Sequence, residues 1–341
     1  AEALLNECTS LGVSAQLEEF TVPCGRVSHA LLRVTSPYVK EYEVTGYERA
    51  ASTPEGGLDA EFLYVENADE VLLEQAKGKI VLVNGYLNRA TYEKLRKAEV
   101  AAILTFTGRT IDRENESDLN RCKLRETLTE PFGAIPVLNM RAASAAEIVR
   151  RGAKTVHIEL TGECYDGTSQ NVCATIPGTD KPSEVITLGG HYDSVYFSSG
   201  VHDNLSGSVI VLELLRYFAA HPPRRTLRFC WFGSEEQGLL GSKAYVKAHA
   251  DELKDCVAML NFDVAAPTLG SNHLVTLATD DALHYVTGVL REAGYGVRAK
   301  QDTYSSDCIP FADNGVPAIN LARFGANGAD YMHNRHDSLK S

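Results

Sequence analysis

The chain has 341 residues, of which 44% are hydrophobic and 23% charged, as in an ordinary folded globular protein. This length favours a large domain, or a domain with an insert. The net charge of -12 argues against a nucleic acid or an anionic membrane surface as a partner. No apolar run reaches the roughly 18 residues that a membrane-spanning helix needs, so we expect no membrane partner.

The first residues, AEALLNECTS, lack a methionine and lie within a predicted helix, which is typical of a trimmed product. The compartment, secreted or cytoplasmic, therefore stays open. Eight cysteines include no CxxC pair, which argues against a cysteine-based zinc site. Disulfides between Cys8 and Cys24, or between Cys122 and Cys164, are left open by the sequence.

Residues 1–163 contain two groups of predicted elements. The first is a helix followed by strand-like segments, at residues 3–12, 13–22, 28–36 and 41–47. The second alternates strand and helix, at residues 77–85, 90–100, 101–108, 134–140, 142–153 and 154–163. We expect the second group to form a small α/β unit with borders near 46 and 163. Its polar loop contains no clear catalytic set.

The alternation of strands and helices is strongest after residue 170. Apolar strands are predicted at residues 184–193, 226–236, 256–263, 273–280 and 316–322. Helices are predicted at residues 206–221, 239–253 and 282–294. Near-continuous apolar strands that alternate with helices predict an α/β fold with a mostly parallel sheet covered by helices.

Acids and histidines gather where these strands end. They are His191 and Asp193 in GGHYDS, Asp203 in GVHDNLSG, Glu235 and Glu236 in GSEEQG, Asp263 in LNFD and His333 in YMHNRHDS. Sites in open α/β sheets form at the carboxyl ends of strands, and imidazole together with carboxylate suits zinc. Two histidines and three acids are enough for a metal pair that shares one bridging carboxylate. The cations would also supply the counter-charge that two adjacent glutamates need when they are buried.

These motifs, in this order and followed by Asp337 after the last histidine, resemble the di-zinc aminopeptidase and glutamate carboxypeptidase family of metallo-exopeptidases. The resemblance covers about residues 165–341. Residues 46–163 are more loosely similar to the protease-associated domain that some members carry as an insert. The resemblance implies a mixed, mostly parallel sheet flanked by helices in 1–45 and 164–341, the zinc-exopeptidase fold, with a smaller inserted α/β domain at 46–163.

The resemblance also implies a ligand set for two zinc ions per chain. His191, Asp203 and Asp263 would hold one ion. Asp203, Glu236 and His333 would hold the other, so that Asp203 is the bridge. His333 is preferred over the nearby His336 because the family's ligand precedes an aspartate by four residues, as His333 precedes Asp337.

Two further site residues follow from the resemblance. Asp193 would orient the ring of His191, as carboxylates commonly do for a ligating imidazole. Glu235 would be the general base. A cis peptide bond is expected after the bridging aspartate, between Asp203 and Asn204.

The sequence departs from the family pattern at two places that concern the substrate. Family members often have tyrosine directly before the last histidine, where it helps to stabilise the oxyanion, but this chain has Met332 there and Tyr331 one position earlier. Tyr331 or Tyr304 would take that role. In SSDCIPF, Cys308 replaces a histidine of the family segment and Asp307 is kept.

We predict a zinc-dependent exopeptidase that removes the N-terminal residue of peptide substrates. A glutamate carboxypeptidase would need arginines that clamp a carboxylate, and only Arg323 and Arg335 lie near the site in the sequence. A glutaminyl cyclase-like enzyme typically binds one zinc and lacks an insert. A catalytically inactive, receptor-like relative would have lost ligands. The preferred side chain and the oligomeric state are left open.

Overall fold

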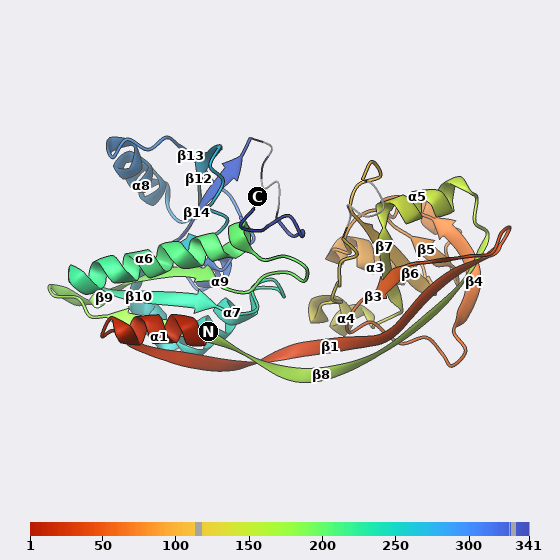
Figure 1. Cartoon of the computed structure of the whole chain (residues 1–341), viewed down its shortest axis with the longest axis horizontal. Coiled ribbons are helices and arrows are strands. Elements are labelled where there is room, and N and C mark those ends of the chain that lie inside the picture. The colour runs from red at the N-terminus through yellow and green to blue at the C-terminus, as the bar shows by residue number, and fades with distance from the viewer. Residues whose placement is uncertain (113–117, 327, 329–331, 341) are drawn as a thin grey trace. The chain divides into compact units, whose positions relative to one another are not determined.

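A computed structural model describes residues 1–112, 118–326, 328 and 332–340 (Figure 1). The chain forms two compact units, one from Ala1–Val22 with Thr168–Ser341 and the other from Pro23–Gly167. Two long strands, β1 (Ser14–Ser36) and β8 (Thr155–Ile176), contribute residues to both.

The observed borders of the smaller unit differ from the predicted 46 and 163. The sequence predicts two strands separated near Pro23, a residue that usually interrupts a strand, but β1 continues through it. In the same way, β8 continues past residue 163 and includes the segment NVCATI. The unit therefore begins within one long strand and ends within another.

The larger unit is built on a sheet with the strand order β13-β12-β14-β11-β9-β10-β8. Its strands are β9 (Lys181–His191), β10 (Arg225–Phe232), β11 (Cys256–Phe262), β12 (Gly270–Leu277), β13 (Val297–Gln301) and β14 (Ala318–Gly325). Strand β9 runs parallel to β10 and β11, β11 runs parallel to β14, and β12 runs parallel to β13. The pairings of β12 with β14 and of β10 with β8 are antiparallel. The predicted mixed, mostly parallel sheet is confirmed.

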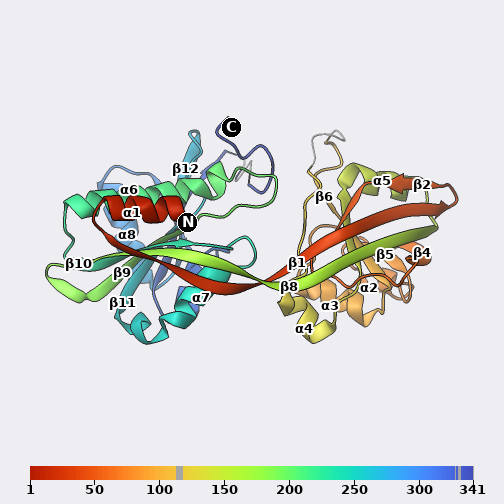
Figure 2. The same cartoon turned by 60° about the horizontal axis from the view of Figure 1, so that its bottom comes forward.

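Helices cover both faces of this sheet, as Figure 1 and Figure 2 show for α6 and α7. The helices of the larger unit are α1 (Glu2–Ser10), α6 (Ser206–Ala220), α7 (Leu240–Ala248), α8 (Asp280–Glu292) and α9 (Cys308–Asp313), with a short 3-10 helix at Ala250–Asp255. Alternate residues of β10 face opposite sides of the sheet. Trp231 packs with Leu215 of α6, whereas Phe232 packs with Tyr245 of α7 and Phe311 of α9.

The smaller unit is itself an α/β structure, with the strand order β4-β5-β6-β7-β3. Its strands are β2 (Lys40–Tyr42), β3 (Val44–Gly46), β4 (Leu58–Tyr64), β5 (Ile80–Leu82), β6 (Ala102–Thr107) and β7 (Val137–Arg141). Its helices are α2 (Glu70–Leu73), α3 (Arg89–Lys97), α4 (Glu126–Phe132) and α5 (Ala142–Arg150). Strands β4 to β7 are parallel neighbours and β3 is antiparallel to β7.

Two further observations concern membrane-spanning helices and disulfide bonds. Among the described residues, no helix combines the length and the apolar character that crossing a membrane requires. All eight cysteines are free thiols, so the structure contains neither a Cys8–Cys24 nor a Cys122–Cys164 disulfide.

Candidate metal centre

The predicted ligands meet because three neighbouring parallel strands end at the same edge of the sheet. His191 is the last residue of β9 and is paired in register with Phe232, the last residue of β10. Glu235 and Glu236 follow β10, and Asp263 follows β11 directly. The chain after these strands therefore delivers imidazole and carboxylate groups to one place, as expected for an open α/β sheet.

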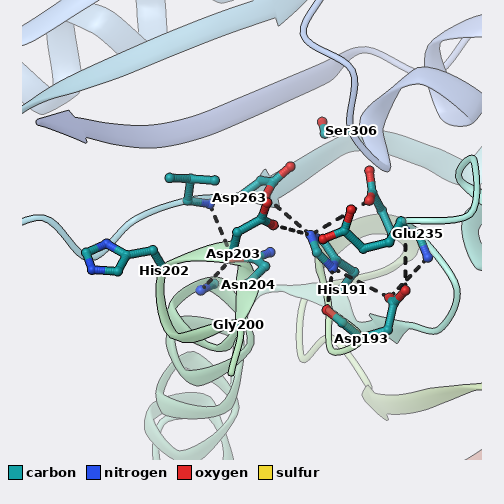
Figure 3. A network of polar contacts seen from close by, with 12 residues as sticks. His191, Asp193, Gly200, His202, Asp203, Asn204, Glu235, Asp263 and Ser306 are labelled. Carbon is teal, nitrogen blue, oxygen red and sulfur yellow. Dashed lines mark hydrogen bonds and ion pairs between the residues drawn. The ribbon is translucent and has the colours of Figure 1, made fainter. Parts of the chain in front are cut away.

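His191 lies at the centre of the first group of ligands (Figure 3). Its Nε2 atom is 3.1 Å from Oδ1 of Asp203, 3.4 Å from Oδ1 of Asp263 and 3.9 Å from Oε2 of Glu235. Ligand atoms of His191, Glu235 and Asp263 all lie within 4.8 Å of one another. We call these three residues the His191 group.

A second group forms beside the first. Nε2 of His333 is 3.1 Å from Oδ2 of Asp203 and 3.1 Å from Oε2 of Glu236. Asp203, Glu236 and His333 also bring ligand atoms within 4.8 Å of one another, and we call them the His333 group. Asp203 turns one oxygen toward each histidine, which is the geometry that a bridging carboxylate needs.

The chemistry of these groups fits two divalent cations. Oε1 of Glu236 and Oδ1 of Asp263 are buried and have no hydrogen-bond partner, and a buried polar atom in that state is costly unless something else compensates it. Carboxylates and imidazoles are ligands of the kind that zinc takes. The two histidines alone face four carboxylates, so the site has an excess of negative charge that cations would balance.

The pKa values at the site reflect burial first and the neighbouring charges second. Burial raises the pKa of Glu235 to about 9, and the nearby charges of Asp307 and Asp263 add to the rise. Burial also raises the pKa of Asp263. Burial opposes protonation of the His191 ring, but its hydrogen bonds with Asp193 and Asp203 outweigh that effect and raise its pKa.

Asp193 contacts both a ligand and the predicted base. The Nδ1 atom of His191 is 3.1 Å from the backbone carbonyl oxygen of Asp193 and 3.5 Å from its carboxylate. The carboxylate itself accepts the backbone N–H groups of Glu235 at 3.0 Å and Glu236 at 3.3 Å. The sequence predicts that Asp193 orients His191; the structure adds that it holds the turn after β10.

Three supporting residues lie outside the predicted set. Asn204, whose bond to Asp203 is cis as the resemblance implies, accepts N–H groups from Gly207 and Val264 and donates to the carbonyl of Phe262. Asn204 thereby joins the segment of Asp203 to that of Asp263. The other two supporting residues, Ser208 and Asp337, each lie a few residues after a predicted ligand. This closeness in the sequence is the signal that could identify them. Ser208, five residues after Asp203, donates to the carbonyl of His191 at 2.7 Å, and Asp337 contacts the segment of Asp203.

The residues predicted to contact the substrate have different surroundings. Burial raises the pKa of Tyr304, and the charges of Asp263 and Asp203 add to the rise. Asp307 is fully buried, which raises its pKa to about 7 and withdraws its carboxylate from solvent. Its charge is one of the causes that raise the pKa of Glu235. Tyr331 lies outside the described residues.

The guanidinium of Arg323 makes hydrogen bonds within the fold. Its guanidinium donates to the carbonyl of Pro267 at 2.8 Å, to Oδ1 of Asn272 at 2.8 Å and to the carbonyl of Thr268 at 3.2 Å. These contacts tie β14 to β12 and to the segment that precedes it.

Two nearby histidines, His202 and His336, are not members of either group. Figure 3 shows the ring of His202 turned away from the His191 group. His336 is exposed and is likewise absent from both groups. The structure thus brings together all five predicted ligands, together with Glu235.

The α/β sheet carries two groups of histidine and carboxylate side chains at its carboxyl edge. This is the arrangement of a protein that binds a pair of metal ions. The sequence profile of Peptidase family M28 matches residues 171–341. The chain belongs to this family, which confirms the resemblance seen in the sequence.

Similar proteins are found both by sequence and by structure. Aminopeptidase YwaD of Bacillus subtilis is 30% identical over 72% of this chain and 53% of its own length. Carboxypeptidase Q of Mus musculus is 26% identical over 69% of this chain and 53% of its own length. The chain therefore spans about half the length of these curated relatives. The structure of BSAP, a zinc aminopeptidase from Bacillus subtilis, superposes with a TM-score of 0.82, 22% identity and coverage of 99% of this chain and 82% of that one, which establishes a common fold.

Proposed function

We propose that this chain is a zinc-dependent aminopeptidase that hydrolyses the N-terminal residue of peptides. The single observation that carries the proposal is the position of Asp203, with one oxygen 3.1 Å from each histidine. It supports two adjacent metal ions held by His191, Asp203 and Asp263 and by Asp203, Glu236 and His333. Zinc bound there would supply Lewis acidity toward a peptide carbonyl and toward water, and positive charge that lowers the pKa of nearby carboxylates.

Glu235 has the surroundings of a general base. It is buried beside His191, with Oε2 3.9 Å from Nε2, and Asp193 fixes its backbone. Its carboxylate would take a proton from the attacking water and return it to the leaving amine. A positioned base of this kind typically contributes about 10²–10⁴ in rate.

The second candidate is a carboxypeptidase, which one relative, carboxypeptidase Q, favours by its name. Recognition of a terminal carboxylate usually employs arginine in a bidentate contact. The guanidinium of Arg323 already donates to three protein oxygens. This engagement favours cleavage from the amino terminus. An inactive relative is disfavoured because both ligand groups are complete.

The test is a panel of short peptides and aminoacyl chromogens, assayed with and without a chelator. We expect cleavage of substrates with a free amino terminus, resistance of their N-acetylated forms, and loss of activity with chelator that zinc restores. Cleavage of blocked peptides, with refusal of peptides whose carboxyl terminus is amidated, would replace this proposal by the carboxypeptidase. Activity that no chelator affects would overturn both.

The unit at Pro23–Gly167 is proposed to be a protease-associated domain that was inserted into the peptidase. Its support is the α/β order of strands β4 to β7 between two strands that also enter the larger unit.

A further inference from the structure

Asp337 joins two segments that are far apart in the sequence. One oxygen of its carboxylate accepts the backbone N–H of His202 at 2.6 Å, and the other accepts the backbone N–H of Asp203 at 3.1 Å. Its carbonyl oxygen also accepts the N–H of Ser199 at 3.1 Å. One residue therefore contacts the segment 199–203 at three points.

The two segments each carry a ligand of the His333 group. Asp203 belongs to the first segment, and His333 lies four residues before Asp337 in the second. Within the second segment, the N–H of Asp337 donates to the carbonyl of Asn334 at 3.1 Å, one residue after His333. Asp337 thus forms a direct link between the backbones that present two ligands to one ion.

The environment of Asp337 makes this link strong. The residue is fully buried, and hydrogen bonds to a buried carboxylate are stronger than those between neutral groups. Removing the carboxylate would leave two backbone N–H groups without these acceptors, one of them that of Asp203, the proposed bridging ligand. Because an unpaired buried N–H is costly, the segment would move to find other partners.

We propose that Asp337 is a positioning residue that fastens the loop of His333 to the loop of Asp203 and so assembles the His333 group. This inference rests on the proposed zinc sites. Of the contacts described above, Asp337 makes none with the residues of the His191 group. Asp203 is proposed to hold both ions but His333 only one, so the effect should be larger on the ion that His333 holds.

The experiment compares zinc binding by the metal-free full chain and by two variants, Asp337→Ala and Asp337→Asn. Zinc is added in a calorimetric titration, and cobalt absorption spectra are recorded on the same proteins. A His333→Ala variant shows which binding step belongs to the His333 group. Val246→Ala, a truncation of a buried residue on α7, controls for loss of stability without loss of this link.

We expect Asp337→Ala to weaken the step assigned by His333→Ala by about 10- to 100-fold, the usual effect of removing a residue that supports a ligand. The other step should weaken less, because it shares Asp203 but not His333 with the first. Asp337→Asn keeps one acceptor oxygen and should have a smaller effect, so it also serves if the alanine variant does not fold. The cobalt spectrum should change most in the bands that His333→Ala removes.

Three results would overturn the inference. They are unchanged affinities in a folded Asp337→Ala variant, an equal loss of both steps, or the same loss in Val246→Ala. Failure of the parent protein to bind two zinc ions would instead count against the proposed function. The experiment therefore distinguishes failure of the inference about Asp337 from failure of the proposed function.

Discussion

The carboxylate of Asp193 accepts the backbone N–H of Glu235 at 3.0 Å. Asp193 follows β9 and Glu235 follows β10, so this bond joins the ends of two parallel strands. The backbone carbonyl of Asp193 is also 3.1 Å from Nδ1 of His191. One residue therefore fixes a proposed ligand with its main chain and the proposed base with its side chain.

The main-chain contact of Asp193 with His191 and its side-chain contact with Glu235 predict different effects in the variant Asp193→Asn. The amide replaces one acceptor oxygen by a donor, so one of the N–H groups of Glu235 and Glu236 loses its partner. We expect kcat to fall by about 10- to 100-fold because the base is misplaced. Zinc content should stay near that of the parent, because His191 keeps its contact with the main chain. Zinc loss as large as in His191→Ala would contradict this assignment.

Glu235→Gln preserves the size of the proposed base and removes its ability to take a proton. We expect kcat to fall by roughly 10²–10⁴, while zinc content stays near two per chain. KM should change little, because the base acts mainly in the transition state. Steady-state kinetics and metal analysis of the purified variant are the measurements. Loss of zinc, without such loss in the corresponding variant of Glu236, would exchange the roles of the two residues.

Glu236→Gln removes a charged member of the His333 group. Its Oε2 atom lies 3.1 Å from His333, so the first effect should be on metal binding. We expect zinc affinity to fall on the order of tenfold or more, with activity partly restored by added zinc. A zinc titration of activity measures both effects. Unchanged zinc affinity would show that Glu236 is not a ligand.

The positions of His191, Glu236 and Asp263 can be predicted because each lies at the end of a strand that the sequence marks clearly, or shortly after it. Asp203 and His333 lie further from a strand, and their assignment comes from the family resemblance. Continuous apolar runs identify β9, β10 and β11, and parallel strands end at one edge. The strand β13 was missed because it lies at the edge of the sheet and its residues, VRAKQ, are mostly polar and partly exposed. The sequence does not predict that β1 is continuous, because proline usually interrupts a strand and Pro23 lies within it.

The supporting contacts could not be predicted for a different reason. Asp337 contacts His202 and Asp203 across more than a hundred residues of sequence, and no local pattern gives such a pairing. The burial of Asp307 likewise depends on how α9 packs against the sheet. The sequence identifies the side chains that are proposed to bind metal or move a proton. The packing of the folded chain determines which neighbouring residues orient those side chains.

A pH-dependent contribution to stability is expected from His157 in the smaller unit. Its Nδ1 is 3.2 Å from Oδ2 of Asp59, and its Nε2 is 3.2 Å from Oε1 of Glu159. Burial opposes protonation of the ring, but these two carboxylates outweigh it and raise its pKa above the usual 6.5. A raised pKa stabilises the fold below the unfolded value, and this contribution disappears as pH rises through the folded value.

The measurement is a double-mutant cycle with His157→Gln and Asp59→Asn in urea unfolding. The coupling between the two residues should be largest at about pH 5.5, where His157 is charged in both states. It should shrink as the pH approaches about 8.5. A coupling that grows with pH would mean that the neutral ring is the stabilising form.

The last prediction concerns Gly207, which lies against Phe262 and Asn204, the neighbours of Asp263 and Asp203 in the sequence. A Cβ atom at this position would lie 2.0 Å from the carbonyl oxygen of Phe262 and 2.5 Å from Oδ1 of Asn204. Both atoms belong to residues adjacent to ligands, so Gly207→Ala must push the two ligands apart. We expect a loss of stability of about 1–3 kcal/mol from overpacking, together with weaker zinc binding.

Gly288 in the middle of α8 is the matched control, because a Cβ there would meet no atom within 4 Å. Gly288→Ala should leave zinc binding unchanged and raise stability by about 0.4–1 kcal/mol, since alanine favours a helix and restricts the unfolded chain. Urea unfolding and zinc titration of both variants separate the close approach at Gly207 from the general effect of adding a methyl group. Equal zinc affinity in the two variants would show that the spacing between Asp203 and Asp263 does not depend on this glycine.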